Sequence, residues 1–394
     1  MKICMVTYSY YFTDARIKGY VNYLGQLGHR VDVLTLKEPH HAEVCKHVSD
    51  FISIHYLTDK YIGKAFVPYI LSYLKFFIAA TWMLTRLWMR KGFHIIHVNN
   101  IPNFIVFTTV LPRIFGVKVI LDMHDIASQL YVEKFGNNKI VARLLALEEI
   151  MSAKYANFII CADDFQKEFL IRNRKLPAEK IQVILNLPDL EIFQNTDTHN
   201  PISSTGPFNI VYHGTITYRL GIDLILRAIA KIKDQIEVKL FLFGAGDYMD
   251  ECLNVIKDLG LRDIVHASNK FFNVEDLPDL LHGMHLGVIG NRISSTTKHM
   301  LPVKMMEYMA LGIPVVVPNM ANIRHYFDER YVCYYQPENI GDLSRKIIML
   351  AHSAERRSEL AEQAYNLIRM HNWNDEFGKY MDVLKVLIKP RSNA

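Results

Sequence analysis

Short apolar runs alternate with helical patterns along almost the whole chain, and this alternation limits the fold more than any other feature. The first apolar run is Lys2–Thr7, a helical stretch covers Asp14–Leu27, and a Val- and Leu-rich run follows at Arg30–Leu36. A strand, a helix and a strand in this order are typical of a parallel sheet with crossover helices. The pattern continues through further predicted strands at His94–Val98, Lys118–Met123, Phe158–Cys161 and Gln182–Ile184.

A polar segment at Asn195–Pro207, rich in Ser, Thr, Gly and Pro, interrupts the alternation and is predicted to be a linker. A second series of predicted strands follows at Asn209–His213, Val238–Phe243, Ile264–Ala267, Leu286–Ile289 and Pro314–Val317. The 394 residues are enough for two domains. We expect an N-terminal domain at 1–195, a C-terminal domain at 208–370, and a helix at 371–394 that packs back on the N-terminal domain.

The predicted fold class is therefore α/β, with two Rossmann-like, doubly wound domains that face a cleft. Ligands of such sheets bind beyond the carboxyl ends of the strands. The composition agrees with a globular protein, because half of the residues are hydrophobic and 22% are charged. The net charge of +5 does not require a nucleic-acid partner, and it suits an anionic small molecule or a membrane surface.

The five cysteines are scattered and include no Cys-x-x-Cys pair, which argues against a disulfide framework and against a zinc site. A reduced compartment fits this usage. The N-terminal residues resemble a first strand and loop more than a signal peptide, so we expect a cytoplasmic protein.

The segment 301–317 carries the most chemical information. It has the pattern of a loop, a helix that begins near Pro302 and Val303, and a buried strand. A helix start offers free N–H groups and partial positive charge, which suit a diphosphate. Lys304 lies in the first turn, and Glu307 lies one turn later on the same face, where its carboxylate could accept two ribose hydroxyls. An ordinary amphipathic helix with an exposed Lys–Glu pair is the alternative.

A second candidate site is the loop that follows the strand at 209–213. The loop opens at Gly214 and ends at Gly221, so its amides together with Arg219 could bind phosphate oxygens. A surface turn with a solvated Arg219 is equally compatible with the pattern.

Taken together, these segments resemble the family 4 glycosyltransferases, which have the GT-B fold. The resemblance is strongest over 208–350 and continues more weakly over 1–190. Its elements follow one another in the family's order: His213-Gly214 to Gly221-Ile222-Asp223, Phe243-Gly-Ala-Gly-Asp247, Pro302-x-Lys304-x-x-Glu307-Tyr-Met-Ala-x-Gly312-x-Pro314, and Tyr334 to Leu343.

The resemblance implies a retaining transferase that uses a nucleotide diphosphate sugar, usually UDP-linked, with no cofactor and no essential metal. Glu307 matches the family's ribose-binding Glu. The implied donor site comprises Pro302, Val303, Gly214, Thr215, Arg219, Lys304 and Glu307. The chain has no Asp-x-Asp triplet, which argues against the metal-dependent glycosyltransferase architecture.

The chain departs from the family's pattern at three places. His299 stands where the family often has a Glu, eight residues before Glu307, and it becomes a candidate sugar contact. The family's usual loop Arg and Lys fall on Thr215 and Leu220, and its N-terminal Gly-Gly pair is missing near Tyr11.

In the N-terminal half, His124 matches the family's cleft histidine, which lies near the reacting sugar. Together with Glu307 it is the candidate catalytic residue, and Asp125, Asn99 and Asn100 are candidate contacts to the donor sugar or the acceptor. Alternatively, His124 is a histidine at a strand end that makes a local hydrogen bond. The alternative for Asn99 and Asn100 is that they are an ordinary pair of loop amides.

The stretch 60–92 carries six Lys or Arg, no Asp or Glu, and several aromatic residues, among them Trp82 and Trp88. An aromatic and basic helix of this kind favours an interfacial position on an anionic membrane. A buried helix pair whose cations reach the solvent is the alternative.

The sequence thus predicts a hexosyltransferase-type enzyme that moves a sugar onto a glycan or lipid-linked acceptor, in surface polysaccharide or glycoconjugate synthesis, peripheral to the membrane. Two alternatives remain at this point: a GT-B-fold nucleotide-sugar epimerase, and a non-catalytic member that binds a nucleotide sugar or a membrane.

Overall fold

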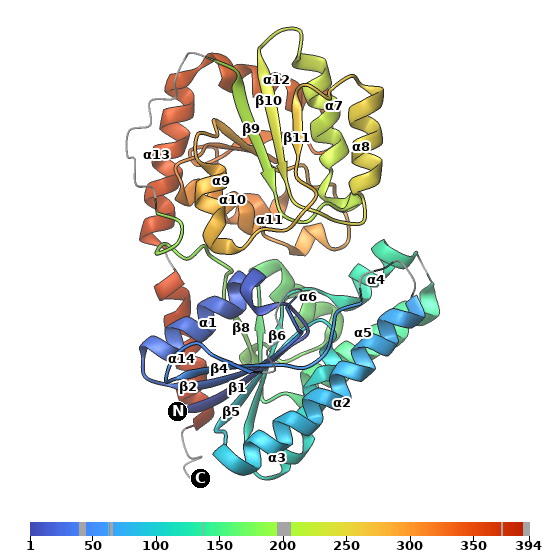
Figure 1. The fold of residues 1–394 in the computed structure, drawn as a ribbon, viewed down its shortest axis with the longest axis vertical. Helices are drawn as coiled ribbons and strands as arrows, with labels where there is room; N and C mark the ends of the chain where they lie inside the picture. Colours follow the sequence, from blue (N-terminus) through green and yellow to red (C-terminus); the bar gives the residue numbers. More distant parts are fainter. Residues whose placement is uncertain are drawn as a thin grey trace. The chain divides into compact units, whose positions relative to one another are not determined.

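The computed structural model describes residues 1–38, 45–61, 63, 66–136, 138–194, 206–371 and 373–388. The chain forms two compact units (Figure 1). Unit 1 comprises Met1–Asn186 with Asn374–Ala394, and unit 2 comprises Leu187–Trp373. The boundary between the units lies at Asn186, earlier in the chain than the linker expected at 195–207, of which 195–205 lie outside the described residues.

Unit 1 is built on an eight-stranded sheet with the order β3-β4-β2-β1-β5-β6-β7-β8. β3 pairs with β4 in the antiparallel sense, and the other neighbouring pairs are parallel. The strands are β1 (Lys2–Thr7), β2 (Arg30–Thr35), β3 (Cys45–His47), β4 (Ile52–Tyr56), β5 (Ile95–Asn99), β6 (Lys118–Met123), β7 (Phe158–Cys161) and β8 (Ile181–Val183).

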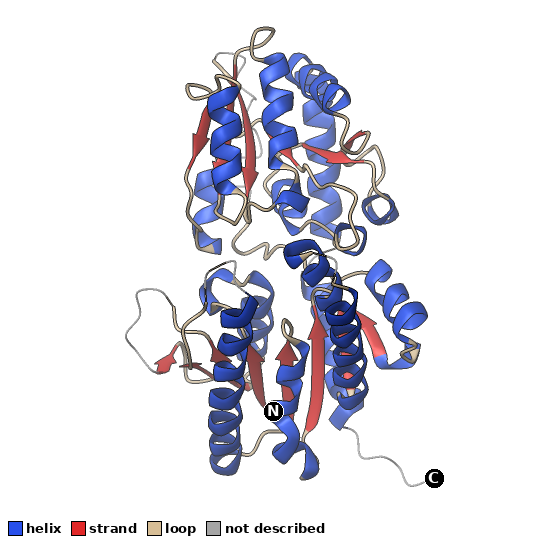
Figure 2. Ribbon diagram, turned by 90° about the vertical axis from the view of Figure 1, so that its right-hand side faces the viewer, coloured by secondary structure: helices blue, strands red, loops and turns tan. Residues whose placement is uncertain are grey.

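Helices cover both faces of this sheet (Figure 2). The helices of unit 1 are α1 (Ala15–Gln26), α2 (Phe66–Lys91), α3 (Val110–Ile114), α4 (Ala127–Phe135), α5 (Lys139–Tyr155), α6 (Asp164–Arg174) and α14 (Trp373–Ile388), with the 3-10 helices η1 (Tyr11–Thr13), η2 (Asn103–Thr109) and η3 (Ala178–Lys180). Because side chains alternate along a strand, Cys4 and Val6 share a core with residues of α2 and η2, while their neighbours face the opposite side of the sheet.

The last helix, α14, packs on unit 1. Its Phe377 and Tyr380 rings lie against Tyr23 and Tyr20 of α1, with ring centroids 3.7 and 4.6 Å apart. The Tyr380 hydroxyl also lies 2.9 Å from Nδ1 of His97 on β5. Aromatic burial of this size and a buried hydrogen bond explain why the chain returns to its first unit after building the second.

Unit 2 has a six-stranded sheet with the order β11-β10-β9-β12-β13-β14, parallel throughout its paired strands. Its strands are β9 (Phe208–His213), β10 (Val238–Phe243), β11 (Val265–Ala267), β12 (Leu286–Val288), β13 (Val315–Pro318) and β14 (Cys333–Tyr335). Its helices are α7 (Ile222–Ile232), α8 (Met249–Asp258), α9 (Leu277–Leu281), α10 (Val303–Ala310), α11 (Ala321–Tyr326), α12 (Ile340–His352) and α13 (Ala354–Met370), with η4 (Tyr218–Leu220), η5 (Val274–Asp276) and η6 (Thr297–His299).

The predicted α/β fold with two doubly wound units is confirmed. The chain order strand, helix, strand places the carboxyl ends of the parallel strands of each sheet at one edge, where loops leave for the next helix. In unit 2 these loops include the one that begins at Gly214 after β9 and the one that leads into α10 at Val303.

Candidate functional site

The start of α10 lies at the end of the central strands of unit 2. Pro302 precedes the helix in an extended conformation, and no side chain caps the first turn. The first turn contains Val303 and Lys304 and no acidic side chain. The helix therefore presents uncapped N–H groups and a cation together, an arrangement that favours an anion.

Lys304 makes its contacts with a tyrosine and not with an acid. Its Nζ donates to the Tyr212 hydroxyl at 2.7 Å and lies 4.0 Å from the centre of the same ring. Among the described residues no carboxylate pairs with it. Burial and, to a smaller extent, the nearby Arg219 lower the pKa of Lys304 to about 7, although Glu307 opposes the shift. An anion bound beside Lys304 would restore its charge.

Glu307 is almost fully buried, with 6% of its surface exposed. Its Oε2 lies 2.7 Å from Nε2 of His213, the last residue of β9. A carboxylate can only accept, so Nε2 carries the proton and donates it. Nδ1 of His213 lies 2.9 Å from the Tyr308 hydroxyl, which also accepts from the His213 backbone N–H at 3.0 Å. Two adjacent residues of α10 thus hold one histidine at both ring nitrogens, and the second oxygen of Glu307 has no partner among the described residues.

Glycines let the loops at this edge approach one another closely. Gly214 has a φ of +99°, which favours glycine, and a Cβ there would lie 3.2 Å from Nζ of Lys304. A Cβ on Gly244 would lie 1.8 Å from the carbonyl oxygen of Gly214, and one on Gly246 would lie 2.0 Å from that of Ile216. No side chain fits at these positions, so backbone packs on backbone beside the lysine.

Arg292, after β12, supports the same loop, and the sequence analysis did not select it. Its guanidinium makes a bidentate contact with Asp223 at 2.9 and 2.7 Å, and it donates to the carbonyl of Tyr218 at 2.7 Å. Its backbone N–H donates to the carbonyl of Arg219 at 2.9 Å. An arginine three residues after the predicted strand at Leu286–Ile289 was the available signal. The adjacent Asn291 is buried, and its Nδ2 has no hydrogen-bond partner among the described residues.

The other predicted donor residues lie at the same edge of the sheet, and they make different contacts there. Arg219 lies in η4, close enough to lower the pKa of Lys304, and its Nε has no hydrogen-bond partner in the part of the chain that the structure describes. The Thr215 side chain is exposed, and its carbonyl accepts from the Tyr212 hydroxyl at 2.7 Å. His299 ends η6, which Asn322 fixes by donating to two carbonyls at 2.9 Å.

Unit 1 has its own polar cluster, centred on Asp122 of β6. Arg16 donates to both carboxylate oxygens of Asp122, at 2.9 and 3.1 Å. Nε2 of His97 lies 3.5 Å and Nε2 of His124 lies 3.3 Å from the same carboxylate. Burial opposes the charge of Asp122, but Arg16 and the histidines outweigh it and hold the pKa of the carboxyl well below its usual range.

The predicted residues around His124 have unequal roles. Asn100 accepts from the His124 backbone N–H at 2.7 Å and donates to the Asp125 carbonyl at 2.7 Å, so it holds the loop after β6. Asn99 is fully buried at the end of β5, and neither polar atom of its amide has a partner among the described residues. A buried amide without a partner costs free energy, which a ligand hydroxyl would recover.

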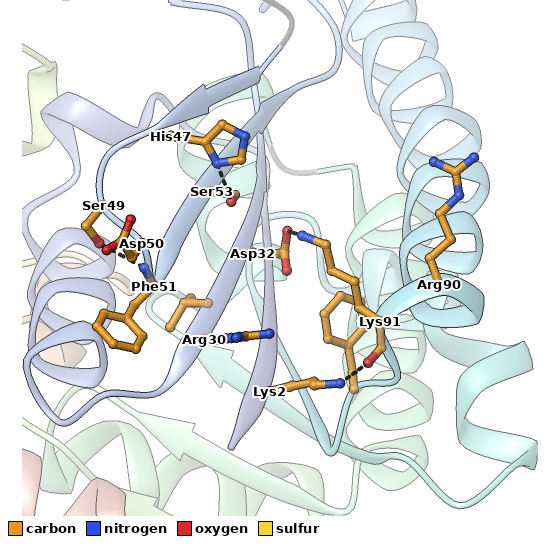
Figure 3. Close-up of a pocket in the computed structure, with 12 residues that line it drawn as sticks. Lys2, Arg30, Asp32, His47, Ser49, Asp50, Phe51, Ser53, Arg90 and Lys91 are labelled. Atoms are coloured by element: carbon orange, nitrogen blue, oxygen red, sulfur yellow. Dashed lines mark hydrogen bonds and ion pairs between the residues drawn. The ribbon is translucent and has the colours of Figure 1, made fainter.

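A cavity of about 650 Å³ lies elsewhere in unit 1, at the amino ends of β1 and β2 (Figure 3). Lys2, Arg30, Arg90 and Lys91 line it, together with Asp32 and Asp50. None of the predicted site residues lines this cavity. In the described part of the chain no three His, Cys, Asp or Glu side chains gather in a way that could hold a metal ion.

Two Rossmann-like units, with a lysine, a glycine-rich loop and a buried glutamate at the sheet edge of the second, define a GT-B glycosyltransferase. A family model described as Glycosyl transferases group 1 matches residues 194–367, and one described as Glycosyltransferase Family 4 matches residues 16–192. The two matches follow one another and leave uncovered residues 1–15, 193 and 368–394. The chain belongs to the family 4 glycosyltransferases.

Relatives and solved structures agree with this assignment. The chitobiosyldiphosphodolichol beta-mannosyltransferase of Candida glabrata is 23% identical over 60% of this chain, and the match spans 58% of that relative's length. The sucrose-phosphate synthase of Thermosynechococcus elongatus superposes with a TM-score of 0.79 at 15% identity, over 98% of this chain and 99% of that one. HepE of Anabaena, in complex with UDP and glucose, superposes with a TM-score of 0.74 at 15% identity, over 98% of this chain and all of that one.

Proposed function

We propose that this glycosyltransferase uses a UDP-linked sugar and transfers it, with retention at the anomeric carbon, to a glycan or lipid-linked acceptor. The observation that carries the proposal is the start of α10, where, among the described residues, Lys304 lacks an anionic partner and Glu307 has a carboxylate oxygen without a partner. The first group fits a diphosphate and the second fits a ribose hydroxyl.

The diphosphate would lie against Lys304, Arg219 and the uncapped first turn of α10. Arg219 is close enough to disfavour the charge of Lys304, and neither residue has an acidic partner among the described residues. An anion of two charges relieves this repulsion. The solved structure of HepE holds UDP, and its fold is the fold of this chain.

The same cations would assist the chemical step. The bond between the anomeric carbon and the diphosphate oxygen breaks as the acceptor hydroxyl oxygen bonds to that carbon and gives up its proton to the departing diphosphate oxygen. Negative charge then grows on the leaving diphosphate, where Lys304, Arg219 and helix N–H groups can stabilise it. We therefore propose a reaction that needs neither a metal nor another cofactor.

In unit 1, we assign contacts with the donor sugar or the acceptor to His124 and Asn99. His124 is partly exposed and its ring is oriented by Asp122 at 3.3 Å, so it can offer its other nitrogen to a hydroxyl. Asn99 offers an amide whose donor and acceptor have no partner among the residues that the structure describes. Asn100 acts on the site by holding the backbone of His124.

For the acceptor, we favour a lipid-linked molecule at the cytoplasmic face of a membrane, in the synthesis of a surface polysaccharide or glycoconjugate. Helix α2 supports this choice, because Val67–Lys91 is long and apolar and only 17% of its most apolar window is buried. The relative from Candida glabrata is, by its name, a mannosyltransferase of a dolichol-linked substrate.

Titration with UDP in a calorimeter tests the donor site. We expect Glu307→Gln to weaken UDP binding about 10- to 100-fold, because a hydrogen bond from ribose to a charged acceptor is lost. The exposed Glu362→Gln on α13 is the matched control and should leave the affinity unchanged. Equal affinity of the Glu307 variant and the wild type would remove the basis of the proposal.

Product analysis tests the reaction itself. A panel of UDP-sugars should raise the melting temperature of the protein to different extents, and the best ligand should release UDP faster when an acceptor is present. Sugar recovered on the acceptor with the anomeric configuration of the donor would agree with retention. An inverted product, or activity that disappears with a chelator, would contradict the retaining and metal-free parts.

A further inference from the structure

The outer side of α2 carries an unusual row of exposed apolar residues. Val67, Ile78, Trp82 and Met89 have 66%, 68%, 60% and 69% of their surface exposed. Of the most apolar window of this helix, only 17% is buried. Isolated exposed apolar side chains are common on soluble proteins, but a continuous row along a helix of 26 residues is not.

The opposite side of α2 belongs to the protein core. Phe76, Ala80 and Leu84, spaced by four residues, are fully buried in the cluster that covers one face of the unit 1 sheet. A helix that packs one side into the core of its own domain cannot be surrounded by lipid. The apolar row is therefore suited to lie on a surface and not to cross a membrane.

Two neighbouring helices extend the row. On α3, Ile114 has 74% of its surface exposed, and Phe115, directly after the helix, has 68% exposed. The Phe115 ring lies 5.3 Å from that of Trp88 on α2, centroid to centroid. The apolar surface therefore continues from α2 onto α3.

Helix α5 repeats the pattern. Ile140, Leu144, Leu147 and Met151 follow one another at intervals of four, three and four residues and are 71%, 60%, 53% and 55% exposed. Its inward Ala153 packs in the same core cluster as the inner side of α2, so both helices cover the same face of the sheet (Figure 1). We call the exposed apolar residues of α2, α3 and α5 the apolar face.

The charges around the apolar face have one sign. Exposed cations on α2 and α5 are Lys75, Arg86, Arg90, Lys139, Arg143 and Lys154, whereas the exposed Lys91 is paired with Asp32 at 2.6 Å. Helix α2 and residues 103–118 contain no acidic residue. The acids of α5 are turned to internal partners: Glu148 accepts from Asn103 at 3.1 Å, and Glu149 accepts from Arg174 at 2.7 Å.

We propose that the apolar face docks on a bilayer that contains anionic lipid, with its three helices lying in the headgroup region. Apolar side chains would enter the acyl boundary while the flanking cations meet lipid phosphates. A second copy of this chain fits less well, because a twofold contact would bring cations against cations without an exposed acid to pair them. The inference rests on the proposed function only in that the bilayer would hold the acceptor.

Vesicle flotation of the full chain tests the docking. The wild type should float with vesicles of phosphatidylcholine and phosphatidylglycerol, bind vesicles of phosphatidylcholine alone more weakly, and lose affinity as salt rises. A triple variant, Ile78→Ser, Trp82→Ser and Ile114→Ser, should bind the anionic vesicles at least about ten-fold more weakly, because buried apolar area drives insertion. The matched control is Met370→Ser on α13, which is 75% exposed in unit 2.

A second variant, Leu144→Ser with Leu147→Ser, tests whether α5 takes part. It should also lose affinity for the anionic vesicles, and wild-type binding by this variant would overturn the three-helix face. A wild type that ignores the vesicles, or forms a dimer that the triple variant abolishes, would overturn the proposal altogether. UDP affinity measured on each variant separates the two proposals, since it should stay at the wild-type value in all of them.

Discussion

Both units place a buried carboxylate and a histidine at the carboxyl edge of the sheet, but they treat the surrounding charge differently. In unit 1, Asp122 meets Arg16 at 2.9 and 3.1 Å, so the buried cation is paired within the protein. In unit 2, Glu307 accepts from Nε2 of His213, and among the described residues Lys304 contacts a tyrosine hydroxyl and ring and no carboxylate.

This difference indicates that the charged residues of unit 1 stabilise the fold, whereas the lysine of unit 2 is suited to bind a ligand. The paired charges of unit 1 connect α1 to β6, and His97 continues the network to α14 through Tyr380. They are therefore part of what holds the unit together. The lysine of unit 2 is buried and has no carboxylate partner among the described residues. A protein tolerates this cost where a bound ligand completes the site.

The largest expected effect comes from breaking the pair in unit 1. Asp122→Asn leaves the Arg16 guanidinium buried without a counter-charge, and we expect the free energy of unfolding of unit 1 to fall by about 3–5 kcal/mol. Because the pKa of Asp122 is held low in the folded state, this stabilisation is present above the carboxyl's unfolded value near ~3.9 and is lost as pH falls through its folded value. Hydrogen exchange of unit 1 peptides measures the change.

Two further variants sharpen that test. Asp125→Asn, three residues along the same loop, should leave the exchange rates almost unchanged, because no described residue pairs with its side chain. Replacing Arg16 and Asp122 together by Leu should destabilise unit 1 less than Asp122→Asn alone. The comparison between the units fails if the double replacement is the more damaging change.

A smaller effect is expected in unit 2 from Tyr308→Phe. The hydroxyl accepts from the buried His213 N–H and contacts Nδ1, so its loss should cost about 1–3 kcal/mol of stability and loosen the ring that orients Glu307. UDP affinity should fall, by less than in Glu307→Gln. Tyr334→Phe also removes a buried hydroxyl, which donates to the carbonyl of Phe327 at 2.8 Å, and it should lower stability without changing UDP affinity.

Local pattern was sufficient to predict most of the elements. The strand limits at Lys2–Thr7, Lys118–Met123 and Val238–Phe243 are confirmed to the residue, because runs of β-branched and apolar residues between turn signals are strong local signals. The strands β3, β4 and β14 were not predicted. β3 and β14 have three residues each, which is too short for a period to be recognised.

The candidate site was predictable only in part. Lys304 and Glu307 are three residues apart on one helix, so their shared face follows from helical geometry. Their partners Tyr212 and His213 lie more than ninety positions earlier in the chain, on β9. Arg292 is likewise far from Asp223, and only the sheet order brings such pairs together. Without a known pairing of strands, the sequence cannot show which distant polar residues meet.

The smallest and most specific effect is a pH dependence of UDP binding. Lys304 has a pKa near 7 in the free protein, so its uncharged fraction grows as pH rises above 7. A diphosphate favours the charged form and raises the pKa in the complex, so binding should take up a proton above pH 7. UDP affinity should then fall by up to about ten-fold per pH unit above 7 and level off below it.

Lys304→Met isolates this effect from the ionisation of UDP itself. The variant should bind UDP more weakly at pH 6 and show no loss of affinity between pH 7 and 8 beyond that of the ligand, whereas the exposed Lys231→Met on α7 should keep the wild-type slope. Calorimetry in buffers of different ionisation enthalpy measures the proton uptake directly. If the wild type and Lys304→Met take up the same number of protons, then Lys304 does not meet the diphosphate, and unit 2 would hold its unpaired lysine for a structural reason, as unit 1 holds Arg16.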